Sequence, residues 1–202
     1  MYAREAVKRT LERMTGVGVP SPANLRAAVR SRRPQTFVFK DDGTIPNNPT
    51  LPLICYRKAV RLMSVVDPAA VLEELFAQNG WEASWRNGIY PFAHYHSAIH
   101  EVLGVARGHA RVRFGGDDGK TLTLATEDVV VLPAGTAHQC LSSSQDLLVV
   151  GAYPAGGHYD ECAGSAEEHD RAVKSVPEVP LPERDPVYGG DGPLLELWAG
   201  HG

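Results

Sequence analysis

The stretch from Gly88 to His138 constrains this chain more than any other, because it spaces four potential metal ligands as a β-barrel would. His94 and His96 are two residues apart, so on a strand their side chains point to the same face. Glu101 follows after a gap of four residues, enough to turn a corner onto the next strand, and His138 follows a Pro-x-Gly turn. Three neutral imidazoles and one carboxylate suit a divalent first-row metal and can leave coordination positions open. The spacing therefore predicts a metal site.

Short strands and turns follow one another from Trp81 to about residue 154. Turn-forming segments such as Gly115–Gly119 and Pro133–Gly135 separate stretches that are rich in apolar and β-branched residues. This pattern favours an all-β core folded as a double-sheet jelly roll. The strands are expected at residues 82–87, 89–96, 101–107, 109–115, 120–124, 128–132, 137–142 and 146–154.

The spacing resembles the first signature of the cupin superfamily, in which Gly, His-x-His, Glu and Gly occur at fixed separations. The residues that match it are Gly88, His94, His96, Glu101 and Gly108. The second cupin signature matches at Pro133, Gly135 and His138, while Glu127 replaces its opening glycine and Ser142 replaces its asparagine. Neither departure touches a predicted ligand. The resemblance implies a double-stranded β-helix, the jelly-roll cupin barrel, with one divalent transition metal (Fe, Mn, Ni or Zn) held by His94, His96, Glu101 and His138.

Segments outside these signatures narrow the resemblance to the YjlB-like family of bacterial cupins. The segments that carry it are IPNNP with LPL, WRNGIYPFAHYHS, VVGAYP and DPVYG, and together they span roughly residues 35 to 198. The family supports the fold and the metal but offers no settled reaction to transfer.

No internal repeat is visible, so we expect a single barrel with helical and extended additions at both ends. The parts are a basic helical arm at 1–34, a strand, extended strap and helix at 35–80, the barrel core at 81–155, and a C-terminal helix and tail at 156–202. Helices are expected over Ala3–Met14, over Ala23–Ser31, between Asp67 and Gly80, and from the Ser165-x-x-Glu168 capping box to about Val176. Gln35–Lys40 reads as a strand, Ile45–Leu53 as an extended strap, and Leu194–Trp198 as an apolar end packed on the barrel.

Alternation places Tyr90 and Phe92 on the inward face of His94, where they would line a partly apolar substrate pocket. The alternative is that both rings only fill barrel volume. His100 precedes Glu101 and is expected outside the ligand set, in a loop or an interface. A ligating Glu101 is not available as a general base, so no catalytic acid or base can be assigned.

Composition limits the classes of protein and partner. Hydrophobic residues make up 43% of the chain, which indicates a folded core, and no apolar run approaches the ~20 residues of a membrane span. Three cysteines at unrelated spacings and no apolar leader favour the cytoplasm. Residues 1–33 contain eight Lys or Arg and two Glu, a local charge of +6, so the remainder carries −10. Because this arm lacks aromatic interleaving and a DNA-reading motif, we expect it to dock on protein rather than on nucleic acid or membrane.

These features favour a metal-dependent enzyme acting on a small oxygen-rich molecule. An oxygenase-type oxidoreductase is the first expectation, because iron, manganese or nickel in such a site can engage dioxygen. An isomerase or decarboxylase of an acid or a sugar comes next. The competing class is a non-catalytic module that binds or senses a ligand and holds a structural metal.

We predict a homodimer. Jelly-roll sheets have edges that need covering, and residues 1–53 and 177–198 supply extended arms whose N-terminal part is opposite in charge to the body. Light scattering at micromolar concentration in moderate salt should give twice the chain mass of 21.9 kDa. A monomer under those conditions would contradict the prediction.

Overall fold

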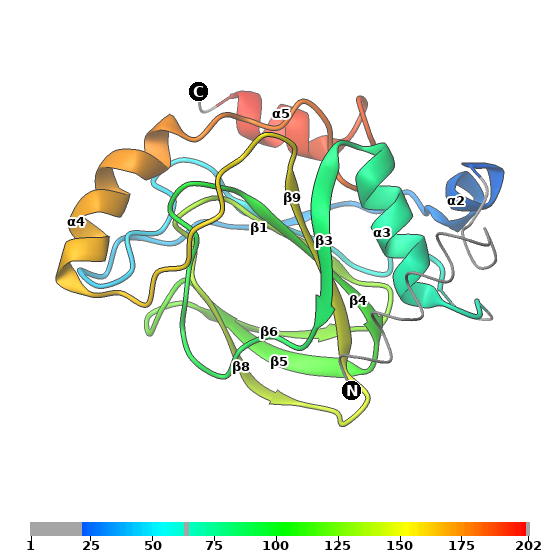
Figure 1. Ribbon diagram of the computed structural model, residues 1–202, viewed down its shortest axis with the longest axis horizontal. Helices are drawn as coiled ribbons and strands as arrows, with labels where there is room; N and C mark the ends of the chain where they lie inside the picture. The colour runs from blue at the N-terminus through cyan, green and yellow to red at the C-terminus, as the bar shows by residue number, and fades with distance from the viewer. Residues whose placement is uncertain (1–21, 63–64, 201–202) are drawn as a thin grey trace.

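The computed structural model describes residues 22–62 and 65–200. Its strands are β1 (Gln35–Phe37), β2 (Leu53–Tyr56), β3 (Trp81–Asn87), β4 (Glu101–Arg107), β5 (His109–Phe114), β6 (Lys120–Ala125), β7 (Val129–Leu132), β8 (His138–Ser143) and β9 (Leu148–Pro154). They form a six-stranded sheet in the order β1-β2-β7-β4-β9-β3 and a three-stranded sheet in the order β6-β5-β8, all paired antiparallel. The sheets face one another across a shared apolar core, with β5, β6 and β8 along the lower side of Figure 1. This is the predicted jelly-roll barrel.

Helices surround the barrel, as Figure 1 shows. They are α2 (Pro22–Ala28), α3 (Pro68–Gln78), α4 (Ala166–Ser175), the 3-10 turn η1 (Val176–Glu178) and α5 (Pro193–Ala199). Asp67 caps α3 by accepting two backbone N–H bonds, and Ser165 and Glu168 form the predicted capping box of α4. The tail was expected only to pack its apolar end on the barrel, but that end forms α5, which starts at Gly192-Pro193.

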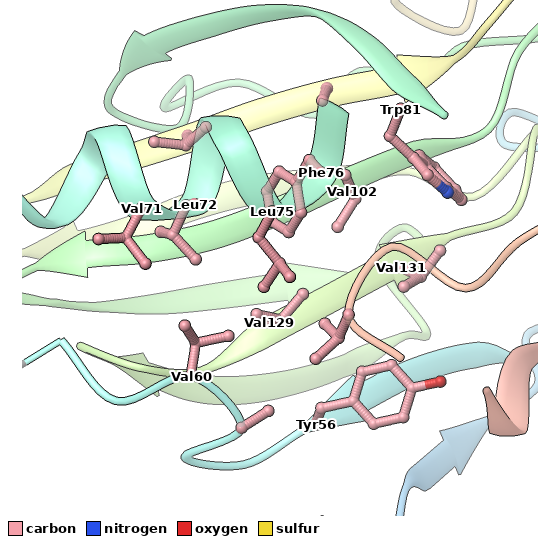
Figure 2. Packing of buried hydrophobic residues seen from close by; sticks show 14 of the residues in the cluster. Tyr56, Val60, Val71, Leu72, Leu75, Phe76, Trp81, Val102, Val129 and Val131 are labelled. Carbon is pink, nitrogen blue, oxygen red and sulfur yellow. The ribbon is translucent and has the colours of Figure 1, made fainter. Parts of the chain in front are cut away.

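The centre of the six-stranded sheet is covered on both faces. On β7, Val129 and Val131 point outward into the apolar cluster that α3 residues such as Leu72 also join, as Figure 2 shows. Val130 and Leu132 point the other way, into the core between the two sheets. Burial of each such side chain contributes about 1.5–3 kcal/mol relative to exposure. The unbroken apolar run of β7 therefore reflects a strand that is buried on both sides.

Seven of the eight strands predicted for the barrel correspond to β3–β9, but the strand predicted at 89–96 is not continuous. This segment does run beside β8. The carbonyl of Tyr90 accepts a hydrogen bond from the N–H of Cys140 at 2.8 Å, and His94 pairs with His138 in an isolated bridge. Between them Pro91 supplies no N–H, and the chain bends there. Ladder pairing is therefore restricted to the two ends of the segment.

The sheet also extends beyond the predicted barrel core, because β2 was not expected as a strand. Its four residues are all fully buried, and Ile54 pairs with Val131 of β7. The composition of residues 45–53 predicts an extended strap that ends at Leu53. A four-residue apolar run that is covered on both faces shows no alternation, so periodicity gives no signal for it.

Glu127, which stands where the second signature has a glycine, adopts a left-handed backbone with φ of +79°. Its carbonyl oxygen accepts a hydrogen bond from the N–H of Ala59 at 3.0 Å. Its carboxylate accepts one from the N–H of Leu62 at 3.0 Å and one from Arg30 Nη1 at 2.9 Å. These bonds fasten the chain before α3 to the turn that leads into β7.

The helix expected over Ala3–Met14 lies outside the described residues. Over the described ranges, no helix has the length and apolar character needed to cross a membrane.

Two substitutions of Glu127 should separate the stability that its side-chain hydrogen bonds contribute from the cost of its positive φ. Glu127→Ala removes the bonds to Leu62 and Arg30, so we expect the free energy of unfolding to fall by about 2–3 kcal/mol. Glu127→Gly loses the same bonds but adopts a positive φ freely, so it should be about 1 kcal/mol more stable than the alanine variant. Urea unfolding of the three proteins measures both differences. An alanine variant as stable as the glycine variant would show that φ at this position carries no strain.

Candidate metal centre

The four predicted ligands meet at one end of the barrel. His94 and His96 lie in the bent segment before β4, Glu101 is the first residue of β4, and His138 is the first residue of β8. All four are buried, between 2% and 6% exposed. Glu101 Oε2 lies 3.4 Å from His96 Nε2 and 3.5 Å from His138 Nε2. The rings of His94 and His138 have centroids 4.1 Å apart, and those of His94 and His96 are 5.8 Å apart.

Backbone pairing holds the three histidines together. His94 and His138 exchange two backbone hydrogen bonds, at 3.3 Å and 2.9 Å, so their side chains share a face. The N–H of Gly135 donates to the carbonyl of His96 at 2.7 Å. Gly135 has φ of +86°, and a Cβ there would come within 2.9 Å of the Asn47 carbonyl oxygen. The glycine of the Pro-x-Gly turn is therefore required by both backbone conformation and space.

Two of the histidines use Nδ1 for support. His94 Nδ1 donates to the carbonyl of Phe92 at 3.3 Å, and His96 Nδ1 donates to the carbonyl of Asp160. A donating Nδ1 leaves the Nε2 lone pair free to ligate, which is the usual arrangement for a histidine bound to metal. His138 directs Nε2 toward Glu101, and its Nδ1 has no hydrogen-bond partner among the described residues.

Burial and neighbouring charges set the protonation of the cluster. Burial lowers the pKa of His94, and burial together with the neighbouring His94 and His96 lowers that of His138 well below its usual value. Burial also opposes the charged form of His96, but the Glu101 carboxylate and the contacts to Asp160 outweigh it and raise the pKa of His96. His94 and His138 are therefore neutral at pH 7, the form in which imidazole binds metals.

Asp160 supports the site from the loop after β9, a role that sequence reasoning missed. Its carboxylate accepts hydrogen bonds from the N–H of Ser97 at 2.9 Å, from Ser97 Oγ at 2.6 Å and from the N–H of Ala98 at 3.0 Å. Its own carbonyl orients His96. Asp160 lies more than sixty residues from these partners, so no local pattern in the sequence points to it.

A second pair of residues reaches Glu101 from β3 and β9. Trp85 Nε1 donates to the Tyr153 hydroxyl at 2.9 Å. Burial and the neighbouring Glu101 carboxylate raise the pKa of Tyr153, which places its hydroxyl beside that carboxylate. The indole of Trp85 lies directly on Gly151, where any Cβ would collide with the ring. Inward alternation along β9 is the signal that could have identified Tyr153.

The four side chains line a cavity of about 440 Å³. Tyr90, predicted for the substrate pocket, also lines this cavity. Phe92 stacks on Tyr90 with ring centroids 4.9 Å apart but does not belong to the lining. Aromatic residues of the lining that were not expected from the sequence are Trp85, Tyr153 and Tyr159.

His100 has a separate structural role. Its Nδ1 accepts a hydrogen bond from the N–H of Ala134 at 2.9 Å, and its ring packs on Trp198 with centroids 4.7 Å apart. Burial lowers its pKa to about 4, so the ring is neutral. It occupies a loop, as expected, but it is buried there.

Across residues 22–62 and 65–200, no group of three or more His, Cys, Asp or Glu side chains is arranged so as to hold a metal ion as it stands. The contacts of Glu101 involve two of the three histidines, while the closest ring neighbour of His94 is His138. The four side chains therefore lie close together, but their positions are not yet those of four ligands around one ion.

Comparison with known proteins finds a curated relative in Bacillus subtilis (strain 168). The uncharacterized protein YjlB of that organism is 42% identical to this chain over 167 residues, which cover 83% of this chain and 98% of the relative. No protein-family model matches the chain.

Solved structures show a weaker likeness. The TDP-quinovose 3,4-ketoisomerase WlaRB from Campylobacter jejuni has a TM-score of 0.35 at 15% identity, covering 45% of this chain and 75% of that one. An acireductone dioxygenase from Bacillus anthracis, with a cadmium ion in its active centre, gives 0.32 at 17% identity, covering 44% and 61%. A deletion mutant of the oxalate decarboxylase OxdC from Bacillus subtilis gives 0.30 at 15%, covering 56% and 24%. TM-scores this low assign neither activity nor substrate to this chain.

Replacing Asp160 should make stability depend on pH in a defined direction. Burial raises the pKa of Asp160, but its hydrogen bonds outweigh burial and lower the pKa below the usual 3.8. The carboxylate therefore stabilises the fold above that value, and the stabilisation is lost as the pH falls through the lowered pKa. Asp160→Asn should reduce the free energy of unfolding at neutral pH by about 1–2 kcal/mol, allowing for partial exposure.

Urea unfolding across the acid range measures this effect, and the two proteins should converge as the carboxylate protonates. Glu161→Gln is a suitable control, because this exposed neighbour should change stability by less than about 0.5 kcal/mol. A difference between wild type and Asp160→Asn that persists unchanged into strong acid would contradict the assignment.

Proposed function

Because this chain belongs to the YjlB-like family of cupins, we propose that His94, His96, Glu101 and His138 hold one divalent transition metal and that the protein is a metal-dependent enzyme. Its substrate is a small molecule that presents oxygen atoms to the metal. The observation that carries this proposal is the buried Glu101 carboxylate, whose Oε2 has two imidazole Nε2 atoms at 3.4 and 3.5 Å and no hydrogen-bond partner among the described residues.

These separations fit the spacing of ligands around one ion. Bonds of about 2.1 Å place neighbouring ligand atoms about 3.0 Å apart in an octahedral arrangement and about 3.4 Å apart in a tetrahedral one. The octahedral arrangement leaves two positions for a substrate. A buried carboxylate oxygen without a donor is costly unless a cation compensates it. Completion of the site needs His94 as well, whose ring is held by a 3.3 Å hydrogen bond to the Phe92 carbonyl and by packing on His138, so its side chain has to rotate to join the others.

The donor set narrows the metal. Three imidazoles and one carboxylate suit iron, manganese, nickel or zinc, whereas calcium and magnesium prefer all-oxygen sites. When bound, such an ion supplies a Lewis acid and, for iron, manganese or nickel, a redox centre. An oxygenase-type reaction is our first assignment, followed by isomerisation or decarboxylation.

The remaining residues have roles in positioning and exclusion of water. The hydrogen bond from Trp85 to Tyr153 fixes the Tyr153 hydroxyl beside the Glu101 carboxylate, where it can orient that ligand. Asp160 fixes the ring of His96 through its carbonyl. Of the wall tyrosines, Tyr153 is buried and excludes water from its side of the cluster, which strengthens electrostatic interactions there.

Metal content tests the ligand assignment. Wild-type protein, saturated with Fe(II), Mn(II) or Zn(II) and then gel-filtered, should retain about one ion per chain by elemental analysis. The double variant His94→Ala/His96→Ala should retain less than about a tenth of that, because two of four ligands are gone. The matched control is His109→Ala, which removes an exposed imidazole on β5 and should keep full occupancy.

Full occupancy in the double variant would contradict the assignment. If wild type holds an ion that no oxygen-donor ligand reaches, the non-catalytic binding module becomes the better interpretation.

A further inference from the structure

The cavity wall around the histidine cluster is built largely from aromatic rings. Tyr90 lies beside His94 with ring centroids 5.2 Å apart, and Tyr159 lies beside His96 at 5.0 Å. Tyr153 continues the second wall, 5.4 Å from Tyr159. Rings beside two of the histidines offer stacking and edge contacts to a flat ligand. Two of the three tyrosine hydroxyls are already engaged, that of Tyr153 by Trp85 and that of Tyr159 by Glu161, which leaves fewer hydrogen bonds for a hydroxyl-rich ligand.

The charges of the lining are nearly balanced. Among the described residues that line the cavity, the one Lys or Arg is Arg86 and the one Asp or Glu is Glu101. The guanidinium of Arg86 is directed at α3, with Nη1 3.0 Å from Asp67 and Nη2 2.6 Å from Glu73. Its charge is therefore offset by two carboxylates and is not available to neutralise a ligand.

These two features define what the site can accept. A divalent ion and the Glu101 carboxylate together carry a charge of +1, so a ligand with one negative charge neutralises the centre. A dianion would leave a surplus negative charge beside Glu101, which is costly because Arg86, the one Lys or Arg among the described lining residues, is already paired with two carboxylates.

Resting on the proposed metal centre, we propose that the substrate is a planar conjugated ring carrying one negative charge shared by two adjacent oxygens. The oxygens face the His94–Glu101 cluster, and the ring lies against Tyr90 and Tyr159. Phosphorylated sugars and dicarboxylates are excluded because the lining supplies no uncommitted cation for a second charge.

A pair of hydroxamates isolates the contribution of the ring. Acetohydroxamate and benzohydroxamate present the same two-oxygen monoanion, and only the second carries an aromatic ring. In zinc-loaded protein, where no redox reaction occurs, calorimetry should give benzohydroxamate an affinity at least about tenfold higher, because two ring contacts are gained. Malonate, a dianion that also offers two oxygens, should bind more weakly than either hydroxamate.

Substitution of the wall should remove the preference. In Tyr90→Ala/Tyr159→Ala the two hydroxamates should bind within about threefold of one another, while zinc content is unchanged. Val38→Ala, which trims an exposed side chain on the segment after β1, is the control and should keep the wild-type ratio. A ratio near one in wild type, a ratio retained in the double variant, or malonate as the tightest ligand would each overturn the proposal.

A separate measurement distinguishes this inference from failure of the metal centre. If zinc does not bind, the proposed function fails, and the aromatic wall is then tested in metal-free protein with 2-naphthol, followed by quenching of tryptophan fluorescence. Quenching that is lost in Tyr90→Ala/Tyr159→Ala supports a site for planar rings. Absence of quenching in wild type overturns it.

Discussion

The double-sided burial of the six-stranded sheet is the constraint on which the rest of this molecule depends. On β4, Val102 packs outward toward α3, while Leu103 packs into the barrel. Glu101 begins the same strand, so its carboxylate is set in a frame that close packing on both faces makes stiff. The stiff backbone holds this carboxylate 3.4 Å and 3.5 Å from the Nε2 atoms of His96 and His138.

Much of the barrel was predictable, because its strands carry their own signals. The segment from β5 to β6 alternates, turns at glycines and returns within a few residues, so local patterns suffice. The exceptions have physical causes. Leu53–Tyr56 is buried on both faces and shows no alternation, and the tail helix α5 is only seven residues long. In the segment 89–96, a proline interrupts an otherwise regular pattern.

The candidate site likewise contains residues that local sequence patterns predict and residues that they do not. His94, His96, Glu101 and His138 could be picked from the sequence, because their spacing is short and regular. The groups that orient them could not. Asp160 and Tyr153 belong to the loop after β9 and to β9 itself, and their contacts to residues 96–101 exist only once the barrel has closed. The cluster is thus encoded locally, whereas its support depends on contacts between distant parts of the chain.

Gly151 never touches the cavity, yet it governs the shape of that space. Because it lacks a side chain, the indole of Trp85 can lie flat on β9, and Tyr153 can stand beside it. Any larger residue there would displace the indole and disturb its hydrogen bond to Tyr153, although no ligating residue would be replaced. The width of the cavity therefore depends on Gly151, a backbone position behind its wall. Redesign of this protein for narrower or wider ligands would begin at that residue.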